Sequence, residues 1–408
     1  MSNALRRGSV LRAVAGIAAL LAALPGVAIA AKNGPGVSDT EIRIGQTMPY
    51  SGPASAYGAI GRAEAAYFRK LNDEGGIGGR KINLISLDDG YSPPKTVEQV
   101  RRLVEQDDVL ATFNMLGTAP NSAVIKYLNG RKVPHLLLAT GANKFNDPAN
   151  FPYTTPGQPS YEAEARIYAK YILKNLPNAK IAVLYQNDDY GKDYLKGLND
   201  ALGDKAAKMV VAQAAYETSD PTIDSQVLAL KASGADVLID VTTPKFAAQA
   251  IRKVAEIGWK PLHFLNNVSI STSGVLQPAG IENAVGLVTG SYLRDPIDPE
   301  WQGDAGLQAY FAWAKKYAPD EDPNSYFVSY GYLEAMTLER ILRQCGDDLS
   351  RENVLKQATR LDKLALPLLL PGITMSTSPT NYAGIRQLQL ARFDGKRWVR
   401  FGELLSAD

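Results

Sequence analysis

The segment with the clearest potential for ligand chemistry is the polar stretch from Thr47 to Gly58, which joins a predicted strand to a predicted helix. Apolar and polar residues alternate from Ile42 to Met48, as in a half-buried strand. Two prolines, two glycines and two serines then end the pattern, and a helix begins near Tyr57. Because the first-turn N–H groups of a helix are unpaired and carry the positive end of its dipole, this loop could hold a small anion. An ordinary connection between a strand and a helix is the alternative.

The sequence contains no recognisable catalytic or metal-binding motif. It has neither a phosphate-binding loop nor a Gly-x-Ser-x-Gly elbow, and the glycine cluster at 75–79 lies between a helix and a strand, which is typical of a helix stop. Asp88 and Asp89 end a predicted strand without a third metal ligand that can be named. Asp188 and Asp189 open a predicted helix, where Asp is expected as a cap. We therefore expect no catalytic residue, no metal and no cofactor.

The composition is that of an ordinary globular chain. The 408 residues are 45% hydrophobic and 21% charged, a length that suggests two or three domains. The two signs of charge are nearly equal, whereas a nucleic-acid-binding protein would need a strongly basic face. The single cysteine, Cys345, lies in a helical pattern and is expected to be a small buried hydrophobic residue. The two histidines, His135 and His263, have no neighbouring ligands at zinc spacing.

Residues 1–30 have the three regions of a secretory signal peptide. Three arginines precede an apolar run from Val14 to Leu24, and Ala28-Ile29-Ala30 follows a Pro-Gly break. The run is shorter than the roughly 20 residues that a membrane anchor needs. We expect export with cleavage after Ala30. Cleavage removes three of the 44 basic residues and none of the 42 acidic ones, which leaves a net charge of −1.

From residue 41 onward the pattern alternates between strands and helices, which predicts parallel sheets covered by helices. The first half has strands at 42–48, 82–87, 109–113 and 135–138, and helices at 57–73, 95–106 and 119–129. The stretch 141–160 is rich in Pro, Gly, Asn and Thr and is interpreted as a crossover. The alternation then resumes, with strands at 180–184, 209–214, 237–241 and 263–265, and helices at 161–174, 190–202, 222–232 and 245–257. Two similar α/β lobes are therefore expected.

The last third of the chain is expected to complete both lobes. A strand at 285–289 leads to a crossover at 292–299, and helices at 300–317, 325–344 and 351–359 are assigned to the first lobe. Alternating runs at 385–393 and 397–401 flank an Asp-Gly turn, which predicts a hairpin. The predicted domains are a signal peptide at 1–30, an N-terminal lobe at 41–155 plus 292–366, a C-terminal lobe at 156–291 plus 380–408, and a third crossover at 367–379. A chain that passes repeatedly between lobes favours a hinged cleft.

Four segments in this order resemble the leucine/isoleucine/valine-binding family of bacterial periplasmic solute receptors. They are Ser51-Gly52-Pro53 with Tyr57-Gly58, the run from Asn72 to Ile82, Asp88-Asp89, and the run from Asn187 to Gly191. Each motif is weak singly, but their joint order is specific. The likeness extends from about Glu41 to the C-terminal hairpin.

The resemblance implies an α/β fold of two Rossmann-like lobes, each a parallel sheet with helices on both faces, joined by three hinge crossovers. It implies a periplasmic receptor, expected to be a monomer, that captures a small solute and delivers it to the inner-membrane permease subunits of an ABC importer. It implies no catalysis, no cofactor and no nucleic-acid partner. The family label favours a small hydrophobic amino acid of the branched-chain type as the ligand.

The resemblance also implies the ligand site. In the family, hydroxyls and backbone N–H groups of two first-lobe loops hold the ligand carboxylate, and the matching loops here are 116–119 and 139–142. An aromatic residue that lines the side-chain pocket, a second-lobe tyrosine that closes over the ligand and a wall residue also have matches. The candidate residues are Tyr57, Gly117, Thr118, Thr140, Gly141, Ala142, Tyr190, Thr243, Asn267 and Phe327. Helix capping by the threonines and core packing by the tyrosines are the alternative roles.

Two departures from the family pattern leave the ligand open. In amino-acid receptors of the family an acidic residue after the strand at 263–265 pairs with the ligand's ammonium, but this chain has no carboxylate between Leu265 and Ile270. The second-lobe tyrosine expected near Thr243 is also missing. Because burial of an unpaired ammonium is costly, either Asp240, Asp188 or Asp189 substitutes, or the ligand is a non-amino amphipathic carboxylate such as an aromatic acid.

Two alternatives come from other functional classes. A ligand-sensing module of a signalling receptor would need a membrane or enzyme segment after Asp408. A secreted α/β enzyme would need a reactive residue in the cleft. We expect neither feature in this protein.

Overall fold

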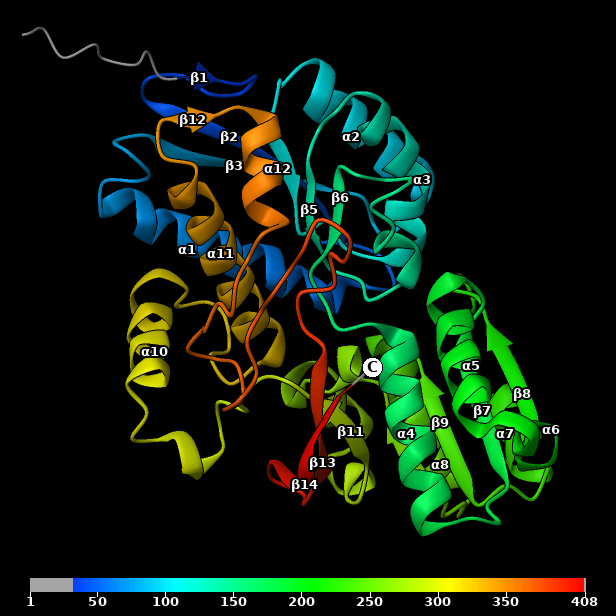
Figure 1. Cartoon of the computed structure of the whole chain (residues 1–408). Coiled ribbons are helices and arrows are strands. Elements are labelled where there is room, and N and C mark those ends of the chain that lie inside the picture. Colours follow the sequence, from blue (N-terminus) through cyan, green and yellow to red (C-terminus); the bar gives the residue numbers. More distant parts are fainter. Residues whose placement is uncertain (1–31, 407–408) are drawn as a thin grey trace, which may run out of the picture. The chain divides into compact units, whose positions relative to one another are not determined.

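The computed structural model describes residues 32–406 (Figure 1). The predicted signal peptide at 1–30 lies outside the described residues. Within 32–406, no helix combines the length and the apolar character that crossing a bilayer requires.

The first sheet is entirely parallel and has the strand order β3-β2-β4-β5-β6. Its strands are β2 (Glu41–Met48), β3 (Lys81–Asp88), β4 (Ala111–Phe113), β5 (His135–Leu138) and β6 (Thr154–Pro156). The helices α1 (Gly58–Asp73), α2 (Pro93–Glu105) and α3 (Thr118–Gly130) follow successive strands of this sheet. In Figure 1, α1 and the later helix α11 (Tyr326–Gln344) lie on one side of the sheet, and α2 and α3 on the other. This arrangement follows from right-handed connections between parallel strands.

The second sheet is mixed and has the strand order β14-β13-β11-β10-β9-β7-β8. Its strands are β7 (Ile181–Gln186), β8 (Val210–Tyr216), β9 (Val237–Val241), β10 (Leu262–Leu265), β11 (Val288–Ser291), β13 (Gln387–Phe393) and β14 (Trp398–Ser406). The main helices of this part are α4 (Tyr161–Asn175), α5 (Asp189–Leu202), α7 (Asp224–Ala232) and α8 (Pro244–Glu256). The predicted hairpin is confirmed as β13 and β14. Because β13 joins the edge antiparallel to β11, the expectation of a purely parallel sheet is wrong here.

The chain passes between the two sheets three times, after β6, after β11 and before β13. After β11 it contributes α10 (Ala305–Tyr317), α11 and α12 (Arg351–Ala358), and α1 packs against α11. The close approach is possible because Gly331 has no side chain: a Cβ there would lie 2.6 Å from the carbonyl oxygen of Ile60. The predicted boundaries of the lobes stay a prediction.

Three short strands were not predicted from the sequence. The stretch 141–160, interpreted as a crossover, contains β6, and a two-stranded parallel pair forms between β1 (Lys32–Asn33) and β12 (Asp348–Leu349). Strands of two or three residues are too short for an alternating pattern to be visible. The short helices α6 (Ala206–Met209) and α9 (Gln277–Ala279) were missed for the same reason.

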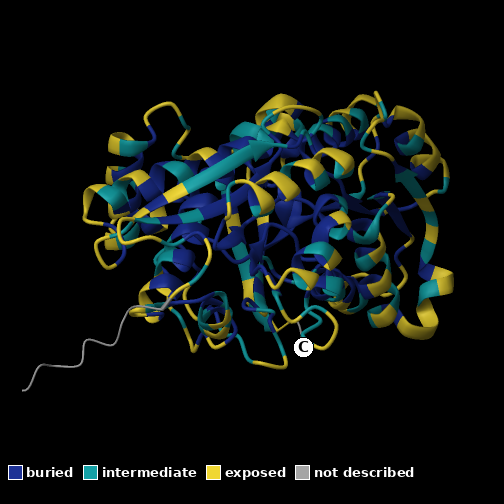
Figure 2. Cartoon of the chain, turned by 90° about the horizontal axis from the view of Figure 1, so that it is seen from above, coloured by how far each residue is buried: buried dark blue, intermediate teal, exposed yellow. Residues whose placement is uncertain are grey.

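Buried residues are concentrated along the strands and the inward-facing sides of the helices, and exposed residues on the outer helices and loops (Figure 2). Inner strands of both sheets are completely buried, for example β5 in the first sheet and β9 in the second. These rigid sheets hold the loops at their strand ends in fixed positions.

Candidate functional site

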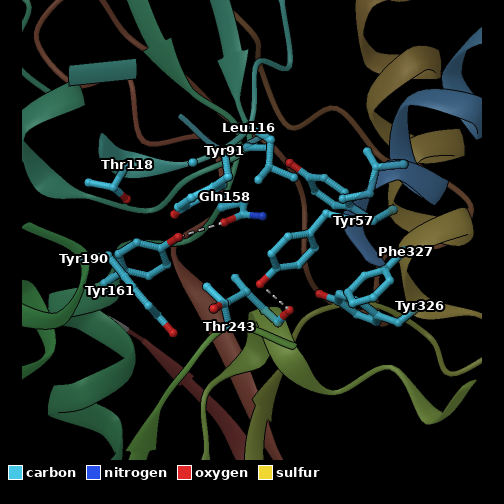
Figure 3. A pocket seen from close by; sticks show the side chains of 15 residues that line it. Tyr57, Tyr91, Leu116, Thr118, Gln158, Tyr161, Tyr190, Thr243, Tyr326 and Phe327 are labelled. Atoms are coloured by element: carbon cyan, nitrogen blue, oxygen red, sulfur yellow. Dashed lines mark hydrogen bonds between the residues drawn. The ribbon is translucent and has the colours of Figure 1, made fainter. Parts of the chain in front are cut away.

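Residues from the connections and helix starts beside both sheets, together with residues of α1 and α11, line a narrow pocket (Figure 3). The volume open to the centre of a water-sized molecule is about 30 Å³. Since one water needs roughly 10–15 Å³ by this measure, a ligand of amino-acid size requires the walls to move apart. The walls are unusually aromatic, with Phe327 and the tyrosines Tyr57, Tyr91, Tyr161, Tyr190, Tyr326 and Tyr330.

The polar end of the pocket is formed by the start of α3 and the loop after β5. Thr118 is the first residue of α3, and its hydroxyl lies 2.7 Å from the hydroxyl of Thr140. The Thr140 hydroxyl also accepts a hydrogen bond of 3.2 Å from the N–H of Ala142. The two threonines are therefore held in one orientation at the ends of neighbouring strands.

The first turn of α3 has backbone N–H groups that are not bonded within the helix. The helix has no side-chain cap, and the helix itself provides no acceptor for the N–H groups of Thr118 and Ala119 in its first turn. Gly117 precedes them with a φ of +100°, and a Cβ at this position would lie 2.4 Å from the ring of Tyr91. Only glycine therefore permits this tight entry into the helix, which directs donors and the positive end of the helix dipole at one wall of the pocket.

The opposite end of the pocket is aromatic. Tyr57 and Phe327 make an edge-to-face contact with ring centroids 5.1 Å apart. The hydroxyl of Tyr57 donates to the carbonyl oxygen of Val268 at 3.1 Å, which links the first helix region to the loop after β10. Figure 3 shows Thr118 on the far side of the pocket from Tyr326 and Phe327. The pocket thus has a polar end and an apolar end.

The wall near Val268 is held by a buried carboxylate, Glu164 of α4. It accepts hydrogen bonds from the N–H of Asn267 at 2.9 Å, from the hydroxyl of Tyr194 at 2.7 Å and from the hydroxyl of Tyr168. Burial raises the pKa of Glu164 to about 7, although these donors favour its charged form. Glu164 therefore fixes the backbone beside the pocket without lining the pocket itself.

Among residues 32–406, no acidic or basic side chain lines the pocket. Asp240 is turned away, since its carboxylate binds Thr242 and His263 at 2.6 and 3.0 Å. Asp188 caps α5 by accepting from the N–H groups of Tyr190 and Gly191. Asp189 forms an ion pair of 2.7 Å with Lys144. Each aspartate considered as a partner for a ligand ammonium thus has another role in the described structure.

The structure brings together six of the ten predicted site residues as pocket lining: Tyr57, Gly117, Thr118, Tyr190, Thr243 and Phe327. Thr140 lies directly behind Thr118, as the hydroxyl contact shows. Ala142 lies behind Thr140, and Gly141 packs against Tyr161, because a Cβ there would lie 2.9 Å from that ring. Asn267 is buried against Glu164, one residue from the wall residue Val268.

Several lining residues were missed, chief among them Tyr91, Gln158, Tyr161, Tyr326 and Tyr330. The spacing of the last two, four residues apart at the start of α11, places them on one helix face, which the sequence could have indicated. Tyr91 and Gln158 lie in connections after β3 and β6, where no periodic pattern exists. The hydroxyl of Tyr161 donates to Gln158 at 3.3 Å, while that of Tyr190 is buried without a hydrogen-bond partner.

The other chemically capable groups have structural roles. Asp88 accepts from the N–H groups of Tyr50 and Ser51 at 3.0 and 3.1 Å, so it closes the loop from Thr47 to Gly58. Burial lowers the pKa of His135 to about 3 and raises that of Cys345 to about 12. Among residues 32–406 no group of three or more His, Cys, Asp or Glu side chains is placed to hold a metal ion.

Comparison with known proteins gives one family. The sequence model described as "Periplasmic binding protein" matches residues 41–397. "Leu/Ile/Val-binding protein homolog 7" of Brucella abortus (strain 2308) is 28% identical over 338 residues, which cover 77% of this chain and 80% of that protein. "Amino acid binding protein" of Pseudomonas aeruginosa is 25% identical over 279 residues, which cover 63% of this chain and 68% of that protein.

Solved structures share the fold. A branched-chain amino acid ABC transporter protein from Thermus thermophilus with bound valine gives a TM-score of 0.81 at 16% identity, and covers 91% of this chain and 97% of its own. A fatty acid ABC transporter substrate-binding protein from Thermomonospora curvata gives a TM-score of 0.76 at 21% identity. The match covers 92% of this chain and 95% of that protein's chain. These likenesses confirm the predicted class of two α/β lobes.

Proposed function

Because the chain belongs to the periplasmic binding proteins of the leucine/isoleucine/valine-binding type, we propose that it is the solute receptor of an ABC importer and captures a non-amino amphipathic carboxylate. Proteins of this family are receptors rather than enzymes. The proposed partners are a small carboxylate ligand and the inner-membrane permease subunits. The proposed location is the periplasm, with export through the predicted signal peptide.

The ligand carboxylate is assigned to the polar end of the pocket. The Thr118 hydroxyl and the first-turn N–H groups of Thr118 and Ala119 offer several donors to one anion. Hydrogen bonds to a charged acceptor contribute roughly 1.5–3 kcal/mol each, so three of them can hold a carboxylate without a basic side chain. The hydroxyl of Tyr190, which has no partner in the described structure, supplies a further donor from the second sheet's side.

The observation that carries the choice of ligand is the absence of any charged side chain from the pocket lining. An α-ammonium buried there would have no counter-charge, and burial of an unpaired charge costs several kcal/mol. A carboxylate with an apolar or aromatic body uses both ends of the pocket and brings no positive charge that would need a counter-charge. Such a ligand fits the walls better than an amino acid does.

A branched-chain amino acid is the second candidate. The names of the relatives in Brucella abortus favour it. Its ammonium would need to bind backbone carbonyls or the ring faces of the tyrosines, since an aromatic ring attracts a cation within about 6 Å.

Matched ligand pairs separate the two candidates. Thermal unfolding of the purified protein is measured with leucine against 4-methylpentanoate and with phenylalanine against 3-phenylpropanoate, where the members of each pair differ only in the ammonium. We expect a rise in the midpoint with the non-amino acids, since a ligand stabilises the folded state by mass action. If the midpoint of unfolding rose with the amino acids alone, a branched-chain or other amino acid would replace the non-amino carboxylate as the proposed ligand. A midpoint unchanged by every carboxylate would refute both.

A further inference from the structure

We propose that the Tyr326 side chain is a gate between the described pocket and a second apolar compartment, and that this compartment takes the far end of an elongated carboxylate such as an arylalkanoic acid. The proposal rests on the proposed function, because it assumes that the ligand's carboxylate lies at the Thr118 end. It adds a second binding compartment and a ligand length.

The second compartment lies directly behind Tyr326. Its lining combines the apolar residues Ile270, Leu293, Pro296 and Trp398 with the polar residues Thr272, Ser291, Asp295 and Asn324. Its open volume is about 20 Å³, against about 30 Å³ for the first pocket. The ring of Tyr326 lines both spaces. Among the described residues, Tyr326 is the one that borders both cavities, so it lies between them.

The same two chain segments form walls of both cavities. The segment after β10 contributes Val268 to the first pocket and Ile270 and Thr272 to the second. The segment that enters α11 contributes Asn324 to the second compartment, and Phe327 lines the first. The hydroxyls of Ser271 and Ser325 approach to 3.3 Å and connect the two segments. Both cavities thus form one trough along these segments, interrupted at Tyr326.

The indole of Trp398 and the carboxylate of Asp295 are already bonded, and Thr272 and Asn324 offer only neutral polar groups to an occupant of the second compartment. The indole N–H of Trp398 donates to the carbonyl oxygen of Ile270 at 3.0 Å. The carboxylate of Asp295 accepts from the N–H groups of Trp398 and Ile297 at 3.1 and 3.2 Å. A second carboxylate would find no basic side chain among the described residues that line this compartment.

Tyr326 itself can move at low cost. Its buried hydroxyl has no well-formed hydrogen bond, and the side chain with which it interacts is the hydroxyl of Tyr292, so rotation of the ring gives up one weak contact. Its aromatic neighbour Tyr292 is in loose edge contact, with centroids 6.4 Å apart. Figure 3 shows Tyr326 beside Phe327 at the end of the pocket opposite Thr118, where the apolar end of a bound carboxylate would lie. A longer ligand would therefore displace this ring first.

The test uses benzoate, phenylacetate, 3-phenylpropanoate and 4-phenylbutanoate, measured by calorimetry on the intact protein. Thr272→Phe fills the second compartment, and we expect it to weaken 4-phenylbutanoate about ten-fold while benzoate changes less than about two-fold. Tyr326→Ala removes the gate and should strengthen 4-phenylbutanoate relative to benzoate. Tyr326→Phe keeps the ring and should behave as the wild type.

Ser273→Phe is the matched control, since Thr272 and Ser273 both border an outer groove but only Thr272 also lines the compartment. Thermal unfolding without ligand confirms that each variant folds. If Thr272→Phe does not fold, Tyr326→Ala still tests the gate independently. Equal effects of Thr272→Phe on long and short acids, or none on either, would overturn the gate and leave the proposed function intact. Failure of the wild type to bind any of the four acids would overturn the non-amino carboxylate as well.

Discussion

The two ends of the pocket differ in how their polar atoms are used. At the polar end, the hydroxyls of Thr118 and Thr140 bind each other, and Thr140 also binds the N–H of Ala142. At the aromatic end, Tyr57 and Phe327 make an edge-to-face contact, and the hydroxyl of Tyr57 donates one hydrogen bond to the carbonyl oxygen of Val268. The first end is fixed by directional bonds, whereas the second is held mainly by packing.

This difference separates two aspects of recognition. Hydrogen bonds of defined direction select the chemical class of a ligand, because an unmatched polar group leaves buried partners unpaired. Packing of rings selects mainly size and shape, with smaller penalties. We therefore expect changes at the Thr118 end to abolish binding, and changes at the Tyr326 end to shift preference among carboxylates. The following predictions test this contrast, from the largest effect to the smallest.

The double substitution Thr118→Val with Thr140→Val should have the largest effect. It removes both hydroxyls at nearly constant volume, and we expect the affinity for the best carboxylate to fall about 100-fold or more, from the loss of charge-assisted hydrogen bonds. Calorimetric titration measures the change. Thr118→Ser with Thr140→Ser keeps both hydroxyls and should retain most of the affinity. An unchanged affinity in a folded double valine variant would remove these residues from the site.

Gly117→Ala should destabilise the polar end itself. The residue has a φ of +100°, and the new Cβ would approach the ring of Tyr91 to 2.4 Å. We expect the free energy of unfolding to fall by about 1–3 kcal/mol, measured by denaturant titration. Gly130→Ala is the matched control at the end of the same helix, because a Cβ there meets no atom within 4 Å. Equal stability of the two variants would contradict the packing argument.

Glu164→Gln should change the pH dependence of stability. The pKa of Glu164 is raised from 4.5 to about 7 in the folded protein, so between these values the folded state binds more protons than the unfolded state. The wild type should lose stability as the pH rises through this window, with a contribution of about 1 kcal/mol per pH unit that is absent from the variant. Denaturant titrations at pH 4.5 to 8 measure the two slopes. Glu98→Gln, at an exposed position of α2, should keep the wild-type slope.

Tyr57→Phe should have the smallest effect of the four. It removes the donor to the carbonyl oxygen of Val268 but keeps the ring that packs on Phe327. We expect an affinity loss of roughly two- to ten-fold, the range of one neutral hydrogen bond of about 0.5–1.5 kcal/mol. Tyr127→Phe removes a surface hydrogen bond to Glu105 and serves as the control that should not alter binding. If Tyr57→Phe lost as much affinity as the double valine variant, the proposed difference between the polar and aromatic ends of the pocket would be wrong.

Much of the fold could be predicted because its signals are local. The alternation from β2 to α8, the C-terminal hairpin and the cap at Asp188 follow from periodicity and from residue types at helix and strand ends. The position of Thr118 at the start of α3, after a glycine with positive φ, also follows from neighbours in sequence. Short segments such as β6 gave no such signal.

The sequence by itself determined the order of elements, the residues at the strand ends and the lack of a carboxylate between Leu265 and Ile270. Only the tertiary structure decided that Asp240 faces His263 instead of the pocket, that Glu164 supports Asn267, and that Tyr326 lies between two cavities. The physical reason is distance along the chain. Which side chains share a cavity depends on the packing of segments that are far apart in sequence, and neither periodicity nor local propensity contains that information.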